Sequence, residues 1–435
     1  MRYSEDIIEE VRSKNDIVDV IGKNVKLQRK GANYFGVCPF HSERTGSFSV
    51  SQSKQIYHCF GCGVGGDVIS FMMKHEKISF PEALKQLAER AGIQFPEEGD
   101  SPRAKEIIEK KRELLGINRE AVWYYTKNLQ RKNGVAGLNY LLSRGLSNET
   151  MNRFGLGYAS SGYNKLANFL KNKGYSDAQI INAGLATFDE TKGLHDKFWN
   201  RVIFPIYDSD GKVIGFGGRV LGEGKPKYLN SPETIIFDKS RNLFGLNYAK
   251  HSNAGYMILC EGYMDVISMH QAGLDMAVAS LGTAFTSGQA QLLKRYTDTV
   301  ILSYDSDDAG IRATLRGIKV LKSVGLKSKV LDLWPYKDPD EFLKHQGKDA
   351  LMERVKQSEN SFLFEIRVLE ASYDMNDPAS KTDFYKKLAE MLNEFEEPLE
   401  RRNYLEAVAA RYNIDPNEMY SLMVSVALEK SAWVQ

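Results

Sequence analysis

The chain contains 435 residues, of which 42% are hydrophobic and 26% charged, and its formal net charge is +2. This is the composition of an ordinary globular protein, so it excludes a disordered tail, a collagen-like repeat and a disulfide-dense secreted module. A chain of this length is expected to fold into about three domains. No apolar run reaches the ~18 residues of a membrane helix, and the N-terminus lacks the apolar stretch of a signal peptide, so we expect a cytoplasmic protein.

The charges are unevenly distributed along the chain. Residues 1–100 hold 13 basic and 14 acidic side chains (net −1), residues 101–260 hold 24 and 14 (net +10), and the remainder holds 21 and 28 (net −7). A basic segment followed by an acidic one suits a polyanion-binding surface beside a divalent-cation site. Solvation of two unrelated surfaces would give the same counts, so motifs must decide between the two interpretations.

Residues 1–100 are expected to form a zinc-ribbon domain with helices on either side of a small β structure. Two ligand pairs, CPFH and CFGC, each place two residues between the ligands, so each pair can chelate one ion from a tight turn. The segments between the pairs are rich in β-forming residues. We therefore predict one structural Zn²⁺ per chain, bound by Cys38, His41, Cys59 and Cys62.

Basic and aromatic side chains alternate over the same ribbon, a composition that can stack unpaired bases and neutralise phosphates. A small ribbon also needs aromatic residues simply to pack, so both interpretations stay open. The residues concerned are Arg29, Lys30, Tyr34, Phe35, Phe48, Lys54, Tyr57 and Phe60.

The rest of the chain is expected to form three further parts after a linker at residues 101–112. Proline, glycine and charge cluster around this linker. Residues 113–250 mix helical and β patterns and form a basic α+β subdomain. Residues 251–348 alternate short apolar strands with helices, which predicts a parallel α/β sheet, and residues 349–435 are helical.

Two strands of the predicted parallel sheet end directly in acidic residues. Glu261 follows the strand that begins at Tyr256, and Asp305 and Asp307 follow the strand TVILSY. Because ligands of parallel α/β sheets bind at the carboxyl ends of the strands, these carboxylates are expected to meet at one edge. Hard oxygen ligands of this kind suit Mg²⁺ or Mn²⁺.

EGYMD followed by DSDDAG resembles the TOPRIM domain of primases, topoisomerases and some nucleases. Together with the CHC2-type ribbon and the segments LLSRGLS, FWNRVIFPIYDSDGKVIGFGGRV and PKYLNSPET, the whole chain resembles the bacterial DNA primases of the DnaG family. The resemblance implies a nucleotidyltransferase of the primosome. Such an enzyme is a DNA-directed RNA polymerase that makes short RNA primers on single-stranded DNA for replication, using two Mg²⁺ or Mn²⁺ ions.

The resemblance also implies site residues. The primary metal ligands would be Glu261, Asp305 and Asp307, and the accessory catalytic acids would be Asp265, Asp338 and Asp340. Asp338 could equally be the N-cap of a helix, and Asp265 could simply favour a helix start. Residues matching the family's nucleotide- or template-binding positions, each of which could instead be an ordinary surface side chain, are Arg144, Arg201, Arg219, Lys227, Tyr228, Asn230 and Lys239.

The implied partners are single-stranded DNA, nucleoside triphosphates, an RNA–DNA hybrid and the replicative helicase, with the protein a monomer in the bacterial cytoplasm at the replication fork. Because the chain ends at Gln435, we expect the family's C-terminal helicase-docking domain to be absent or truncated. Two alternatives remain. One is another TOPRIM enzyme, a topoisomerase or nuclease, and the other is a non-catalytic zinc-ribbon module that binds single-stranded DNA.

Overall fold

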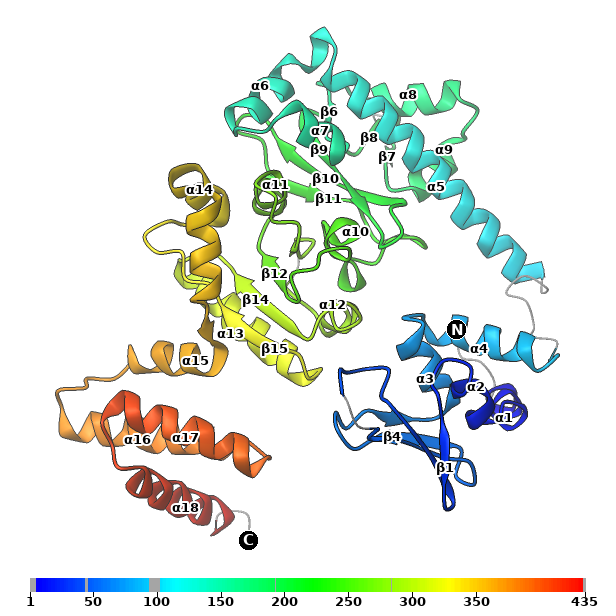
Figure 1. Ribbon diagram of the computed structural model, residues 1–435. Coiled ribbons are helices and arrows are strands. Elements are labelled where there is room, and N and C mark those ends of the chain that lie inside the picture. Colours follow the sequence, from blue (N-terminus) through cyan, green and yellow to red (C-terminus); the bar gives the residue numbers. More distant parts are fainter. Residues whose placement is uncertain (1–4, 44–45, 94–101, 192, 283, 433–435) are drawn as a thin grey trace. The chain divides into compact units, whose positions relative to one another are not determined.

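The computed structural model describes residues 5–43, 46–93, 102–191, 193–282 and 284–432 (Figure 1). The chain divides into two compact units, Met1–Lys110 and Lys111–Gln435. Among the described helices, none combines the length and the apolar character needed to cross a membrane.

The N-terminal unit is an antiparallel sheet of order β1-β2-β3-β4-β5 with helices beside it. Phe48, Tyr57 and Phe71 form its aromatic centre, each 1% exposed or less. Asp67 caps one helix, and Ser79 with Glu82 forms a capping box at the next. The elements are α1 (Glu5–Lys14), α2 (Ile17–Ile21), β1 (Gln28–Lys30), β2 (Asn33–Gly36), β3 (Phe48–Ser51), β4 (Ile56–Cys59), β5 (Gly65–Gly66), α3 (Val68–His75) and α4 (Phe80–Arg90).

Helix α5 (Pro102–Leu129) occupies most of the segment assigned above to a linker. Proline suits the first position of a helix, and Lys110 pairs with Glu106 one turn earlier, with Nζ and Oε1 2.6 Å apart. The charged side chains of residues 105–112 are exposed, so this charge is that of a solvated helix. Residue 101 lies outside the described residues.

A second antiparallel sheet, of order β11-β10-β9-β6, follows α5. Strands β9 and β10 form a hairpin whose turn contains Asp210 and Gly211, and Gly211 has a φ of 80°. The elements are η1 (Lys132–Gly134), α6 (Val135–Ser143), α7 (Asn148–Arg153), β6 (Gly157–Ala159), α8 (Lys165–Asn172), α9 (Asp177–Asn182), β7 (Ala186–Asp189), β8 (Gly193–Asp196), β9 (Arg201–Tyr207), β10 (Val213–Val220), β11 (Tyr228–Asn230), η2 (Lys239–Arg241) and α10 (Leu246–Ala249).

The third sheet has the order β13-β12-β14-β15-β16 and is parallel except for the short edge strand β16. Cys260 pairs with Ser303, so β12 and β14 end side by side. The predicted alternation of strands and helices is confirmed. The elements are β12 (Met257–Cys260), α11 (Tyr263–Gln271), β13 (Ala277–Ala279), α12 (Ser287–Leu293), β14 (Thr299–Ser303), α13 (Asp308–Ser323), β15 (Lys327–Val330), α14 (Pro339–Lys356) and β16 (Glu359–Asn360).

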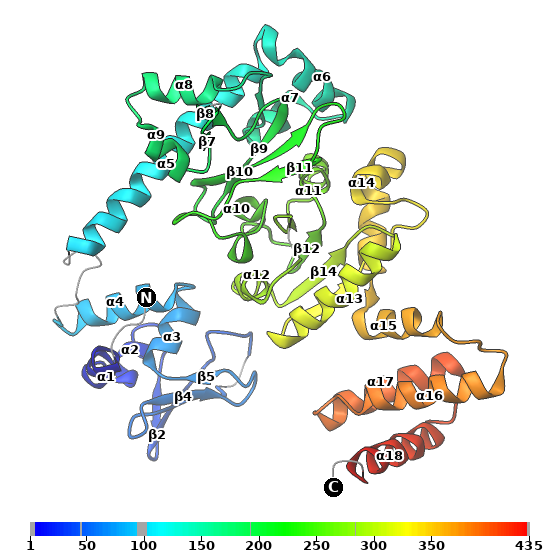
Figure 2. The same cartoon turned by 180° about the vertical axis from the view of Figure 1, so that it is seen from behind.

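Helices cover both faces of this parallel sheet (Figure 2). Ile258 and Ile301 belong to the core that contains residues of α11 and α14, whereas Leu259 and Leu302 belong to the core beneath α12 and α13. Neighbouring strand residues point to opposite faces, which explains why these strands are continuously apolar rather than alternating.

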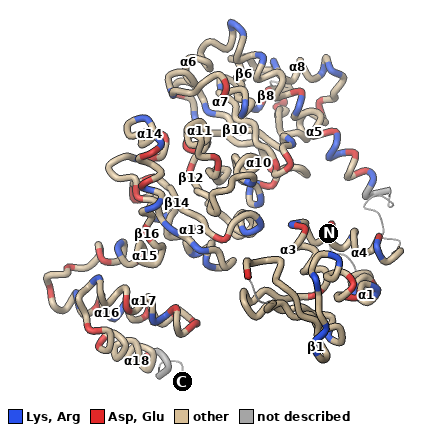
Figure 3. Tube along the Cα trace, viewed as in Figure 1, with Lys and Arg blue, Asp and Glu red and all other residues tan. Residues whose placement is uncertain are grey.

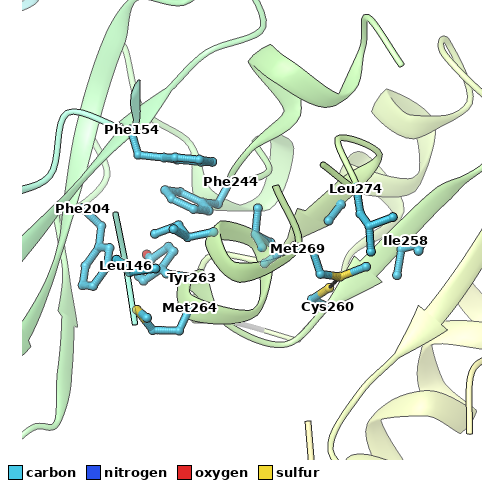
Figure 4. Packing of buried hydrophobic residues seen from close by; sticks show 14 of the residues in the cluster. Leu146, Phe154, Phe204, Phe244, Ile258, Cys260, Tyr263, Met264, Met269 and Leu274 are labelled. Atoms are coloured by element: carbon cyan, nitrogen blue, oxygen red, sulfur yellow. Dashed lines mark hydrogen bonds between the residues drawn. The ribbon is translucent and has the colours of Figure 1, made fainter. Parts of the chain in front are cut away.

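One hydrophobic core joins the second and third sheets. Tyr263 of α11 stacks on Phe204 of β9 with ring centroids 5.2 Å apart, and Phe244 meets the Tyr263 ring edge-on at 4.7 Å. Gly217 of β10 leaves room for this ring, because a Cβ there would lie 2.5 Å from a Tyr263 ring carbon. Figure 4 shows Phe204, Phe244 and Tyr263 packed beside Met264 and Phe154. The basic segment and the acidic strand ends are therefore held in one folded unit.

The C-terminal region is helical, as predicted. Three of its helices start at a proline, and Asp377 and Glu397 cap two of them with side-chain oxygens. Phe384 and Val408 belong to a separate core and are fully buried. The helices are α15 (Ser361–Glu370), α16 (Pro378–Leu392), α17 (Pro398–Tyr412) and α18 (Pro416–Ala432).

Candidate functional site

The four predicted zinc ligands lie together in the N-terminal unit. The ligand atoms of Cys38, His41, Cys59 and Cys62 all lie within 4.8 Å of one another. Cys38 Sγ is 3.9 Å from Cys62 Sγ, and Cys59 Sγ is 3.8 Å from His41 Nδ1. A tetrahedral zinc ion with Zn–S bonds of about 2.3 Å separates its sulfur ligands by about 3.8 Å. The donor set and its spacing therefore fit Zn²⁺.

Glu43 links three parts of this zinc site and was not singled out from the sequence. Its Oε1 accepts hydrogen bonds from the backbone N–H groups of Cys38 (2.7 Å) and Ser47 (3.0 Å). Its Oε2 accepts from the Ser47 hydroxyl and lies 3.3 Å from His41 Nε2. The hydrogen bonds from Ser47 lower the pKa of Glu43. His41 thus turns Nδ1 towards the other ligands while Nε2 faces a carboxylate, the usual arrangement of a zinc-binding histidine.

The alternating basic and aromatic residues of the ribbon divide between core and surface. Phe48 and Tyr57 are buried, with ring centroids 5.3 Å apart. Phe60 is 72% exposed, and Arg29 and Lys30 lie on an exposed strand. Only part of the predicted set is therefore free to contact a nucleic acid.

The strand-terminal acids come together at the edge of the parallel sheet. The backbone N–H of Asp305 donates to Glu261 Oε2 at 3.4 Å, because β12 and β14 end side by side. Asp307 caps α13 by accepting a hydrogen bond from the Gly310 backbone at 2.9 Å. Gly310 allows this helix to start close to the strand end, since a Cβ on Gly310 would lie 1.9 Å from the Asp305 carbonyl oxygen.

Two further predicted acids lie near this edge. Asp265 accepts a hydrogen bond from the Gly262 backbone at 3.0 Å, and Asp338 caps α14 through the Glu341 backbone at 2.8 Å. Burial and the charge of Asp338 raise the pKa of Asp265 to about 8. Both predicted helix-start roles are thus present in addition to any role at the metal.

The electrostatics of the edge favour a cation. Burial and the charge of Asp305 raise the pKa of Glu261. Burial and the charge of Asp338 likewise raise the pKa of Asp305, although Lys337 opposes the effect with its Nζ 3.1 Å from Asp305 Oδ2. Crowded carboxylates with hard oxygen donors fit Mg²⁺ or Mn²⁺. Among the described residues, the four zinc ligands are the only group of three or more acidic, histidine or cysteine residues whose ligand atoms all lie within 4.8 Å of one another. At the sheet edge, Asp305 Oδ2 instead pairs with Lys337, and Asp307 accepts from the Gly310 backbone.

A cavity of about 590 Å³ opens over this acidic edge. Four of the predicted nucleotide- or template-binding residues line it, namely Arg144, Lys227, Tyr228 and Asn230. Asn230 also fixes β11 to the parallel sheet, because it accepts from the Tyr263 hydroxyl and donates to the Leu281 carbonyl. The acids on its wall are Glu261, Asp265, Asp305 and Asp338. Two basic lining residues, Arg316 and Lys337, were missed, although Arg316 follows Ala313 by one helical turn on the face of α13 that lines the cavity.

The remaining predicted residues lie outside this cavity lining. Arg201 is 6% exposed, and its Nη1 donates to the carbonyls of Gly218 (3.0 Å) and Pro226 (2.9 Å). Arg219 places its guanidinium 4.2 Å from the Tyr140 ring centroid. Lys239 begins η2. Figure 3 shows further Lys and Arg residues at intervals along α5, so the positive charge of the middle segment is not confined to the cavity.

Asp340 also departs from the expected arrangement. It is 3% exposed and pairs with Arg144 and with Lys344, whose Nζ lies 2.8 Å from Asp340 Oδ2. It does not line the 590 Å³ cavity, although Asp338 does. Asp307, an exposed residue, also lies outside the cavity lining.

Four segments of the chain match known protein families. Residues 3–103 match the CHC2 zinc finger, residues 124–250 the N-terminal domain of the DNA primase catalytic core, and residues 258–343 the Toprim-like family. Residues 362–417 match the DnaB-helicase binding domain of primase. Of the expectation that the docking domain is absent or truncated, absence is therefore wrong. Helical periodicity identifies helices, but it carries no sign of the partner that they bind.

The chain is also similar to named primases over most of its length. The DNA primase of Clostridium acetobutylicum is 46% identical over 429 residues, which make up 98% of this chain and 71% of that protein. The crystal structure of the zinc-binding and RNA polymerase domains of Aquifex aeolicus primase has 35% identity and a TM-score of 0.61, covering 96% of this chain and 99% of that one. A DnaG primase catalytic domain bound to single-stranded DNA has 34% identity and a TM-score of 0.61, covering 70% and 99%.

These matches cover both units and agree with the zinc centre and the parallel sheet. They leave no support for a topoisomerase, a nuclease or a non-catalytic binding module. The chain therefore belongs to the DnaG family of bacterial DNA primases, zinc-containing and magnesium-dependent nucleotidyltransferases that synthesise RNA primers as DNA-directed RNA polymerases.

Proposed function

We propose that the cavity above the parallel sheet is the site of nucleotidyl transfer in this chain. Glu261, Asp305 and Asp307 would hold the divalent metal, with Asp265 and Asp338 as nearby accessory acids. The observation that carries the proposal is the contact between Glu261 and Asp305 on the floor of a cavity that basic residues also line. When bound, the metal pair supplies charge neutralisation and activation of the attacking 3′-hydroxyl.

The basic wall of the cavity would bind the incoming nucleoside triphosphate and the template. Arg144 can offer a planar fork to phosphate oxygens, and Lys227 supplies a point charge. Tyr228 presents a ring to the cavity, and burial raises the pKa of its hydroxyl to about 12, so it remains a neutral hydrogen-bond donor at pH 7. Arg201, Arg219 and Lys239 would act outside the cavity, by supporting β10 or by contacting DNA beyond it.

The partners follow from the family. We expect single-stranded DNA as template, an RNA–DNA hybrid as product and the replicative helicase as a partner of the segment 362–417. A monomer in the cytoplasm at the replication fork would carry out the reaction. We assign residues 1–100 to the DNA-binding zinc ribbon, 113–250 and 251–348 to the polymerase core, and 349–435 to the helical C-terminal region, with α5 leading into the core.

The acidic site is tested by primer synthesis with labelled nucleotides on defined single-stranded DNA, using the zinc-loaded full chain with Mg²⁺ or Mn²⁺. Asp305→Asn should lower synthesis by more than about a hundredfold, because one proposed metal ligand loses its charge and the ion that would stabilise the transition state is held less well. Circular dichroism should be unchanged. Asp308→Asn is the matched control, since this exposed acid of the same motif is not one of the proposed metal ligands. Full activity of Asp305→Asn would refute the assignment.

A further inference from the structure

Asp340 has the chemistry of a metal ligand but its carboxylate is already occupied. Oδ2 accepts hydrogen bonds from Arg144 Nη2 and Lys344 Nζ, and Oδ1 accepts from the Ser268 hydroxyl. Burial alone would raise the pKa of Asp340, but the hydrogen bonds from Lys344 and Ser268 and the charge of Arg144 outweigh burial and lower this pKa. The Asp340 carboxylate is therefore ionised at pH 7. A carboxylate held on both oxygens by protein donors has little capacity left for a metal ion.

The helix that carries Asp340 explains why it differs from Asp338. Asp338 is the N-cap of α14, and Asp340 is the second residue of the helix. Two residues correspond to about 200° of rotation around a helix axis, so the two side chains leave on opposite sides. Asp338 lines the cavity, whereas Asp340 enters the buried region between α14 and α11, where Ser268 lies. The two acids of the DPD sequence therefore cannot have the same role.

Arg144 connects this buried carboxylate to the cavity. It caps the C-terminal end of α6, one-third of its side chain is exposed, and it lines the cavity beside Lys227 and Tyr228. Its Nε is enclosed and has no acceptor among the described residues. Asp340 carries one negative charge between two cations, so Arg144 keeps attraction for an anion. Arg144 comes from the basic segment and Asp340 from the acidic one, 196 residues apart.

We propose that Asp340 is a positioning residue that fixes the Arg144 guanidinium at the cavity wall, ready for the phosphates of a nucleoside triphosphate, and that it does not bind the catalytic metal. The inference rests on the proposed nucleotide site. Holding the long Arg144 side chain before the ligand arrives removes part of the ordering cost that would otherwise weaken binding. The Asp340 carboxylate does not use all five N–H groups of the Arg144 guanidinium, so N–H donors remain for phosphate oxygens.

The test uses the zinc-loaded full chain and two binding measurements that need no catalysis. Mn²⁺ affinity is measured by electron paramagnetic resonance, and affinity for a fluorescent ATP analogue by anisotropy. Asp340→Asn should leave Mn²⁺ affinity within about twofold of the parent and weaken the ATP analogue about tenfold, the loss expected for one charge-assisted hydrogen bond. Asp338→Asn, changed two residues away, should instead weaken Mn²⁺ binding at least fivefold.

A double-mutant cycle distinguishes failure of the positioning role of Asp340 from failure of the proposed nucleotide site. Arg144→Met should weaken the ATP analogue about tenfold, and adding Asp340→Asn should cause no further loss. If Arg144→Met leaves this affinity unchanged, the proposed nucleotide site fails. If Arg144→Met weakens it but the two losses multiply, or if Asp340→Asn lowers Mn²⁺ affinity fivefold or more, the positioning role is overturned.

A second pair covers the case in which Asp340→Asn does not fold. Arg144→Met combined with Asp340→Leu replaces the buried ion pair by apolar groups of similar size, a change that folded proteins often tolerate. Unchanged Mn²⁺ affinity in this variant supports the proposal, and a fivefold decrease contradicts it.

Discussion

Glu43 offers a direct test of how the zinc site is held. Its carboxylate meets four donor groups, two backbone N–H groups on Oε1 and the Ser47 hydroxyl and His41 Nε2 on Oε2. In Glu43→Gln one oxygen can keep the Cys38 and Ser47 backbone bonds. The new amide N–H₂ then faces His41 Nε2, which is a donor in a histidine that uses Nδ1 as ligand, and the Ser47 hydroxyl, which must turn from donor to acceptor. Glu43→Ala leaves all four donors without this acceptor. Loss of a residue that orients a metal ligand typically weakens metal binding by 10–100-fold, so we expect a decrease of about tenfold for Gln and about a hundredfold for Ala.

Zinc affinity would be measured by competition with a chromophoric chelator under reducing conditions. Glu89→Gln is the matched control, because this acid lies in the same unit with 65% of its side chain exposed and its carboxylate is 4.0 Å from Lys85 Nζ. Affinity should fall in the order parent, Gln variant, Ala variant, because the Gln side chain still accepts the two backbone hydrogen bonds and the Ala side chain accepts none. A Glu43→Gln protein that holds zinc as tightly as Glu89→Gln would refute the reasoning, since the carboxylate would then be irrelevant to the ligands beside it.

Two other predictions concern the second unit. Gly310→Ala should weaken Mn²⁺ binding at least fivefold in paramagnetic resonance titrations. The new Cβ cannot stay 1.9 Å from the Asp305 carbonyl oxygen, so either the start of α13 or the segment at Asp305 must move. Unchanged affinity would contradict this, since it would mean that the chain between Asp305 and α13 adapts without cost. His270 is buried with its Nε2–H on the Ala277 carbonyl, and burial lowers its pKa from 6.5 to about 4. His270 has the higher pKa in the unfolded chain, so as pH falls the unfolded state is protonated before the folded state and is stabilised relative to it. At 1.36 kcal/mol per pKa unit, the free energy of unfolding should fall by about 3 kcal/mol between pH 6.5 and pH 4. Denaturation across this range should be flatter for His270→Gln than for the parent, and identical slopes would contradict the assignment.

The features that the sequence predicts well depend on short segments or on simple periodicity. A pair such as Cys59 and Cys62 is close in space because it is close in the chain, and only the meeting of two such pairs requires folding. Strands β12 and β14 are short, apolar and followed by helices, which indicates a parallel sheet and hence places Glu261 and Asp305 at the same edge.

The features that the sequence does not reveal depend on which way an element faces. Nothing in the sequence distinguishes the roles of the two aspartates Asp338 and Asp340. The packing of Phe342 and Leu351 in the core fixes the orientation of α14, and this orientation turns the two carboxylates in different directions. Arg201 has the chemistry of a phosphate ligand, but the pairing of β9 with β10 buries it against backbone carbonyls. The segment 101–112 has both the proline and charge typical of a linker and the charge pattern of an exposed helix. No Gly or Pro occurs between positions 103 and 112, and this stretch forms the first part of α5.

The uneven charge of the sequence becomes an asymmetry across one cavity. Four acids and four basic residues line it. Arg144 and Lys227 come from the segment with net charge +10, whereas the four acids, together with Arg316 and Lys337, come from the segment with net charge −7. The pKa of Glu261 is raised by burial and by Asp305, so the acidic wall is destabilised when nothing neutralises it. A bare triphosphate would meet repulsion from that wall, and a bare cation would gain nothing from the basic wall. A metal–triphosphate complex carries both signs and can satisfy both walls at once, so we expect each of its components to strengthen binding of the other. We therefore expect the presence of both signs of charge around one cavity to favour binding of the complex over either component alone.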